Sequence, residues 1–124
     1  STHSGDQNEI IAYLCGIHGL TSEVDRFLSL SKKSSYWSEM DRLAAIALAK
    51  NDTTETERIT KIITDIINYA DMADSSKGIG YYNLARLYKS VGDNENSNKC
   101  IEEAKKSIPK LLATRQKLDP LFNV

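Results

Sequence analysis

The chain has little of what interrupts or cross-links a helical protein: two cysteines, two prolines and six glycines among 124 residues. Two cysteines without a framework pattern do not indicate a secreted, disulfide-stapled scaffold, so we expect a cytoplasmic protein. A chain of this length buries roughly two-thirds of its unfolded surface on folding. We therefore expect one domain over residues 1–124 that folds without a disulfide or a metal.

A dominant charge and a long apolar run are also missing. Sixteen Lys and Arg residues face seventeen Asp and Glu residues, which gives a net charge of −1. Such a balance provides no general attraction to nucleic acid or to an acidic membrane surface. No apolar stretch approaches the roughly 20 residues that a membrane-spanning helix needs. The sequence thus predicts neither nucleic acid nor membrane as a partner.

Residues that carry chemistry are few. The two histidines are His3 and His18, and Cys15-x-x-His18 is one thiol–imidazole pair, whereas a metal site needs three or four ligands. Gly78-Ile79-Gly80 lacks the preceding strand and the lysine–threonine ending of a phosphate-binding loop. We expect no enzyme, no cofactor and no metal site. An enzyme centred on Cys15 and His18 is the least favoured alternative.

What dominates the sequence is an apolar period of three to four residues, which is typical of amphipathic helices. A capping box, Thr54-x-x-Glu57, predicts one helix start, Pro109 predicts another, and Ser75–Gly80 predicts a break between helices. Helices joined by short turns pack antiparallel, so we expect an all-α fold of helical hairpins. The predicted helices span about 6–18, 22–30, 35–50, 54–74, 79–91, 94–107 and 109–118.

One segment, residues 78–111, carries a longer pattern. It reads Tyr81-x-x-Leu84-Ala85-x-x-Tyr88, then Gly92-Asp93, Ser97-x-x-x-Ile101-x-x-Ala104 and Pro109. This pattern resembles a tetratricopeptide repeat over about 34 residues, with mild departures at Ala85, Ser97 and Ile101. Residues 35–74 look like a degenerate relative, and residues 6–30 form a hairpin without a signature. Residues 112–124 resemble the capping tail that ends such arrays.

The resemblance implies about three antiparallel hairpins in a right-handed superhelix, closed by a C-terminal capping helix. It also implies a concave groove that binds a peptide or a protein segment. The packing face of helix 79–91 would carry Tyr81, and its groove face would carry Tyr82, Asn83, Arg86 and Lys89. Asn83 stands where groove asparagines of such repeats hydrogen-bond a ligand, and the two cations would pair with acidic ligand groups.

The sequence therefore favours an adaptor or scaffold module whose partner is a protein or peptide. Two alternatives stay open at this point. One is a homo-oligomer, such as a homodimer, that packs on its own groove or outer face. The other is a regulatory or immunity-type protein dedicated to one partner. An exposed Asn-Arg-Lys row can also be only a solvated helix face.

Overall fold

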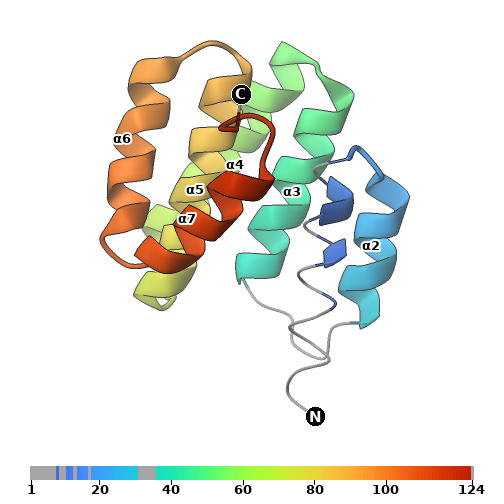
Figure 1. Cartoon of the computed structure of the whole chain (residues 1–124), viewed down its shortest axis with the longest axis horizontal. Coiled ribbons are helices and arrows are strands. Elements are labelled where there is room, and N and C mark those ends of the chain that lie inside the picture. Colours follow the sequence, from blue (N-terminus) through green and yellow to red (C-terminus); the bar gives the residue numbers. More distant parts are fainter. Residues whose placement is uncertain (1–7, 9–10, 13, 17, 31–35, 124) are drawn as a thin grey trace.

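The structure is a computed structural model that describes residues 8, 11–12, 14–16, 18–30 and 36–123. In this part of the chain the regular elements are all helices, which confirms the predicted all-α class (Figure 1). The helical residues between 8 and 16 belong to a first helix, α1. The others are α2 (Thr21–Leu30), α3 (Tyr36–Lys50), α4 (Thr53–Tyr69), α5 (Asp74–Ser90), α6 (Asn94–Lys105) and α7 (Pro109–Leu118).

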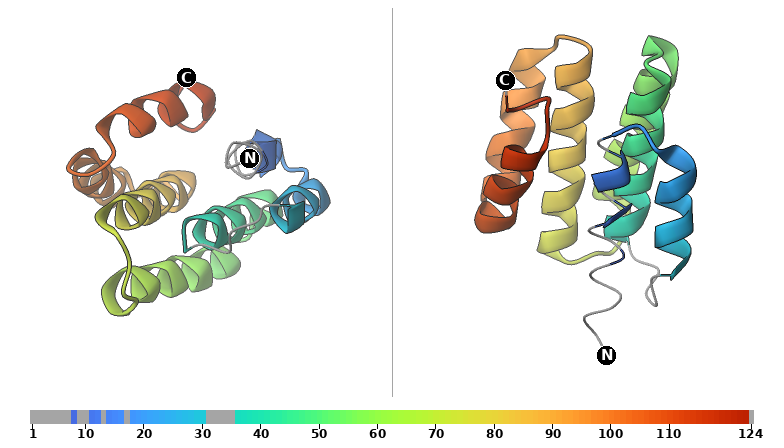
Figure 2. Two further views of the ribbon diagram at one scale, coloured as in Figure 1. Left: turned by 90° about the horizontal axis from the view of Figure 1, so that it is seen from below. Right: turned by 45° about the vertical axis from the view of Figure 1, so that its right-hand side comes forward.

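The helices form two layers. Seen end-on in the left view of Figure 2, α1, α3, α5 and α7 form the inner layer, and α2, α4 and α6 lie outside them. The region between the inner helices, which we call the central space, holds side chains of α3, α5 and α7 that contact one another. The most extensive close packing joins α5 to α6, and α3 packs against both α5 and α4. Because α7 folds back over the inner side, the C-terminal segment lies across the central space from α3.

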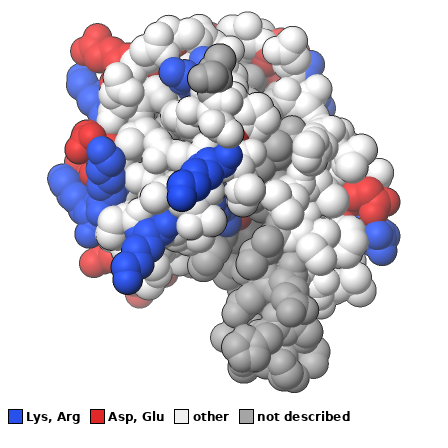
Figure 3. Space-filling model, in the orientation of Figure 1, with Lys and Arg blue, Asp and Glu red and all other residues white. Residues whose placement is uncertain are grey.

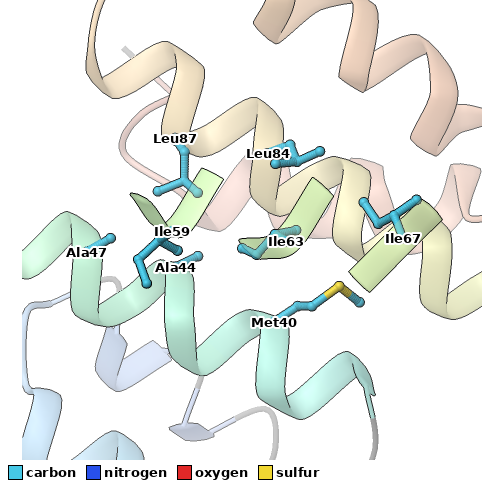
Figure 4. Close-up of a cluster of buried hydrophobic side chains, with 8 residues drawn as sticks. All are labelled: Met40, Ala44, Ala47, Ile59, Ile63, Ile67, Leu84 and Leu87. Carbon is cyan, nitrogen blue, oxygen red and sulfur yellow. The ribbon is translucent and has the colours of Figure 1, made fainter. Parts of the chain in front are cut away.

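Two apolar clusters hold these layers together. In the first, Ile59, Ile63 and Ile67 form one face of α4 and pack between α3 and α5 (Figure 4). The small residues Ala44 and Ala47 of α3 face them, and small residues let helices approach closely. The second cluster joins α5, α6 and α7 and consists of Ile79, Tyr82, Ala85, Ile101, Ala104, Ile108 and Leu112. Burial offsets the low helix propensity of the isoleucines.

The predicted break at Ser75–Gly80 is wrong, because α5 begins at Asp74 and runs through both glycines. A Cβ atom at Gly80 would lie 2.8 Å from side-chain atoms of Ile67 and Met40. A Cβ atom at Gly78 would lie 2.9 Å from the side chain of Ile108. These glycines therefore serve close helix packing, and tertiary contacts override their poor helix propensity.

Two predictions for α4 are also wrong. The helix ends at Tyr69, five residues short of the expected limit, and Ala70 is its extended C-terminal cap. Its N-cap is Asp52, whose side chain accepts a hydrogen bond from the Thr54 amide at 3.0 Å. The Thr54–Glu57 capping box is thus replaced by an aspartate cap two residues earlier, which satisfies the Thr54 amide at the helix start.

The predicted turn and helix start on either side of α6 are confirmed. Gly92 has a φ of +82°, a left-handed conformation that glycine adopts without strain. Pro109 stands at the start of α7, which ends at Leu118 before Asp119-Pro120. The predicted linker Ser31–Ser35 lies outside the described residues.

Candidate binding site

The side chains predicted to line an open groove are mostly covered. Tyr82 and Asn83 are fully buried, and Arg86 is only 2% exposed. Lys89 is half-buried, with its Nζ 5.9 Å from the centre of the Phe122 ring. The expectation that Tyr82, Asn83 and Arg86 face a solvent-filled groove is wrong, because α7 and the residues after it lie over this face of α5. Tyr81, the expected inner residue, is only half-buried.

One end of the covered face is organised around the carboxylate of Asp119, the C-cap residue of α7. Arg86 Nε and the Tyr82 hydroxyl both donate to Asp119 Oδ2, each at 2.7 Å. The other oxygen, Oδ1, accepts a hydrogen bond from the Leu121 amide at 3.0 Å. This buried ion pair therefore ties α5 to the C-terminal segment.

A second buried carboxylate, Asp41 of α3, organises the other end. Arg115 of α7 donates to both of its oxygens, at 2.7 and 2.9 Å. Asn83 Nδ2 donates to Asp41 Oδ1 at 2.8 Å, and Asn83 Oδ1 accepts from Arg86 Nη1 at 3.0 Å. Asn83 thus joins the two ion pairs into one buried network across α3, α5 and α7.

This network is balanced in charge, with two arginines and two aspartates, and its groups are satisfied by one another. Buried charges are retained only when paired and hydrogen-bonded, and these side chains meet that requirement internally. Sequence reasoning missed Asp41 and Asp119. A usable signal was Arg115 between Leu112 and Leu118 on the apolar side of the last helix, because such an arginine needs a buried carboxylate.

The central space stays open at one end, where a cavity of about 380 Å³ lies beside the C-terminal ends of α3 and α5. We call it the mouth cavity. Arg86 and Asp119 form its buried end. The remaining lining is mixed in polarity and consists of Gly16, Gly19, Leu48, Ala49, Asn51, Ser90, Pro120 and Leu121.

The electrostatic character of the mouth cavity follows from the helix ends around it. The C-terminal end of a helix carries the negative pole of its dipole, with carbonyl groups that lack intrahelical donors. Both α3 and α5 end at this cavity, at Lys50 and Ser90. The dipoles of these two helices favour hydrogen-bond donors over carboxylates at the cavity, and the lysines in their last turns, Lys50 and Lys89, offset part of this field.

The thiols and histidines do not form a reactive constellation in the part of the chain that the structure describes. Cys15 and Cys100 are free, and His18 is exposed. Burial raises the pKa of the Cys100 thiol to about 11, and the carboxylates of Glu103 and Asp93 add to this effect. The described residues contain no group of three or more His, Cys, Asp or Glu side chains suited to a metal ion. That the chain is not an enzyme stays a prediction.

Comparison with known proteins adds no relative. No protein-family model, no curated protein and no solved structure matches the chain. The resemblance to tetratricopeptide repeats therefore rests on the residues of segment 78–111. Among the described helices, none is long and apolar enough to cross a membrane.

Proposed function

We propose that the chain is a protein-interaction module built of tetratricopeptide-like hairpins. The contacts within segment 78–111 support this reading. Ala85 of α5 and Ala104 of α6 are fully buried in the cluster that joins these helices. Ser97, which replaces the alanine of the repeat, donates its hydroxyl to the Ala85 carbonyl at 2.9 Å. Small residues at these positions serve the close helix approach that the repeat requires.

The observation that carries the proposal is the mouth cavity. The inner face of a superhelical array is its usual docking surface, and here the C-terminal segment covers much of that face. The mouth cavity is a part that solvent still reaches, and its volume of about 380 Å³ falls within the range of ligand pockets. A segment of a partner protein would place a side chain there.

The lining indicates which side chain fits. Leu48, Ala49 and Leu121 offer apolar walls, and Asn51 and Ser90 offer polar groups near two negative helix ends. A side chain with an apolar stem and a donating head, such as lysine or arginine, satisfies both parts of this lining.

The test uses two variants of the same helix. Ser90→Trp fills the mouth cavity, and Ser75→Trp places the same bulk on an exposed position at the other end of α5. The wild-type chain and both variants are immobilised, and proteins captured from a lysate of the source organism are compared. We expect a partner that Ser75→Trp retains and Ser90→Trp loses.

Other outcomes count against the proposal. A partner retained equally by both variants would place the binding surface elsewhere. Recovery of the chain alone by all three baits would favour the homo-oligomer. Thermal unfolding of both variants controls for loss of folding.

A further inference from the structure

Surface charge does not single out a site on the face of the molecule drawn in Figure 3. Most of this face consists of uncharged residues, and Lys, Arg, Asp and Glu are scattered over it. At the end of α6, Lys105 and Lys106 each pair with a glutamate three residues earlier on the same helix. The buried polar side chains, by contrast, contain one clear irregularity.

One buried polar side chain has no hydrogen-bond partner. Among the described residues, the buried polar or charged residues are Asp41, Thr56, Asn83, Arg86, Ser97, Arg115 and Asp119. All but Thr56 form side-chain hydrogen bonds, either in the network of α3, α5 and α7 or, for Ser97, with the Ala85 carbonyl. Thr56 is only 5% exposed, and its hydroxyl forms no hydrogen bond within the described part of the chain. Because buried polar groups in folded proteins are nearly always paired, this hydroxyl needs an explanation.

Thr56 lies on the face of α4 that carries the buried isoleucines. The buried residues of this helix are Thr56, Ile59, Ile63 and Ile67, which are spaced three and four apart. An apolar side chain would continue this row more favourably, since it carries no group that needs a partner. The threonine therefore indicates that a polar group is used at this end of α4.

Thr56 lines a groove of about 400 Å³ beside the C-terminal end of α5, which we call the α4–α5 groove. On one side it is lined by residues of α4, and on the other by residues at the end of α5 and in the turn after it. These residues are Thr56, Glu57, Thr60, Lys61, Thr64, Tyr88, Val91 and Asp93. The groove shares no lining residue with the mouth cavity, so it is a separate site. Its volume falls within the range of ligand pockets.

The hydroxyls of the groove are of two kinds. Thr60 and Thr64 donate theirs to the backbone carbonyls four residues earlier, at 2.7 and 2.8 Å. The Tyr88 hydroxyl, like that of Thr56, forms no hydrogen bond within the residues that the structure describes. Burial raises the pKa of Tyr88, which keeps its phenol group neutral. Thr56 and Tyr88 therefore offer the hydroxyls that a ligand can use.

The lining also defines the chemistry of a ligand. The Tyr88 ring, the half-exposed Val91 and the threonine methyl groups offer apolar surface. The charged residues of the lining are of both signs, so they select no charge. A charged ligand group would exchange its hydration for neutral hydroxyls at the Thr56 end of the groove, which is unfavourable. The groove therefore fits a neutral ligand with an apolar body and one hydrogen-bonding group.

We propose that the α4–α5 groove is a second binding site, which takes a phenol. The apolar ring of the ligand would lie against Tyr88 and Val91, since aromatic rings pack favourably on one another. Its hydroxyl would form the missing hydrogen bond with Thr56. The same chemistry is offered by a tyrosine side chain of a partner protein and by a free phenolic molecule. The proposal goes beyond the proposed function and does not use the mouth cavity.

The test compares two probes that differ only in the hydroxyl, N-acetyl-L-tyrosinamide and N-acetyl-L-phenylalaninamide. Each probe is titrated into the isotope-labelled wild type and into Thr56→Val, which keeps the shape of the side chain and removes its hydroxyl. Thr114→Val makes the same change at an exposed position of α7 and serves as the control. Dissociation constants are obtained from the chemical-shift changes of backbone amides in NMR spectra.

We expect the wild type and Thr114→Val to bind the tyrosine probe about three- to tenfold more tightly than the phenylalanine probe. In Thr56→Val the two probes should bind alike, because the partner of the phenol hydroxyl is gone. In the wild type the shifted amides should be those of residues 56–64 and 88–93. Equal binding of the two probes by the wild type, or a preference that survives in Thr56→Val, would overturn the proposal.

The variant Ser90→Trp, which fills the mouth cavity, separates this proposal from the proposed function. It should keep the preference for the tyrosine probe. A preference that is lost in Ser90→Trp and kept in Thr56→Val would place the ring in the mouth cavity and contradict the groove site. Failure of one site is thus distinguishable from failure of the other.

The source of the phenol is distinguished with a third probe, an Ala-Ala-Tyr-Ala-Ala peptide blocked at both ends. Tighter binding of this peptide than of the tyrosine probe would support the site and assign the ring to a partner protein. Equal binding would also support the site and assign the ring to a free small molecule.

Thermal unfolding separates a ligand-binding hydroxyl from a structural one. Because the Thr56 hydroxyl has no partner in the described fold, valine removes an unpaired polar group from a buried position. We therefore expect the unfolding midpoint of Thr56→Val to equal or exceed that of the wild type. A lower midpoint would show that the hydroxyl is bonded within the fold and would overturn the proposal.

Discussion

At the scale of single residues, the buried polar network has the clearest energetic consequence. Its two ion pairs, Arg86–Asp119 and Arg115–Asp41, are nearly inaccessible to water. Removing two charges from water is costly, so such pairs contribute less to stability than their short distances suggest. Removing one partner is different, because the remaining charge stays buried without its counterion.

Asp119→Ala tests this asymmetry. The substitution removes the acceptor shared by Arg86 and Tyr82, and we expect the free energy of unfolding to fall by about 3–5 kcal/mol. Urea denaturation of the variant and the wild type measures the difference. The matched control is Asp71→Ala, an exposed aspartate, for which about 0.5 kcal/mol or less is expected. A loss at Asp119 as small as that of the control would contradict the described network.

At the scale of helices, local sequence signals and tertiary packing compete most visibly in α5. Its first two turns contain Gly78 and Gly80, and its sequence there favours a break more than a helix. The helix forms because Gly80 lets α5 approach Ile67 of α4 and Met40 of α3 within a buried cluster. Packing of apolar surface supplies the stability that local propensity does not.

The substitution Gly80→Ala tests this explanation. In an exposed helix interior the change stabilises by roughly 0.5–1 kcal/mol, because alanine has the higher helix propensity. At position 80 the added Cβ would meet packed side-chain atoms at 2.8 Å. We therefore expect a destabilisation of about 1–3 kcal/mol in denaturant unfolding. A stabilised variant would mean that the side chains of Ile67 and Met40 shift at little cost, and that close packing does not require a glycine at this position.

At the scale of the whole molecule, the C-terminal segment decides whether the central space is open or filled. α7 contributes Leu112 to one apolar cluster and Arg115 to the polar network, and Asp119 follows directly after it. The inner faces of α3 and α5 depend on these side chains for their cover. With this space covered, the mouth cavity is the surface proposed for a partner.

Truncation after Ser107 removes this cover. The buried carboxylate of Asp41 loses Arg115, and the cluster around Ile79 becomes exposed. We expect a larger drop in the midpoint of thermal unfolding than for Asp119→Ala, together with binding of the dye ANS to exposed apolar surface. Removal of Asn123 and Val124 alone serves as the control and should change the midpoint little. A truncated chain that unfolds cooperatively at the wild-type midpoint would show that the hairpins are stable without α7.

The amino-acid sequence by itself determined the helical class and the position of most turns. The turn at Gly92 and the start of α7 at Pro109 depend on the backbone preferences of one or two residues. Both can therefore be predicted from the local sequence. Only the tertiary structure decided that the predicted binding side chains of α5 face inwards. Their partners are remote, since Asp119 follows Arg86 by 33 positions and Asp41 precedes Asn83 by 42. Helical periodicity shows which residues share a face, but the path of α7 sets what covers that face.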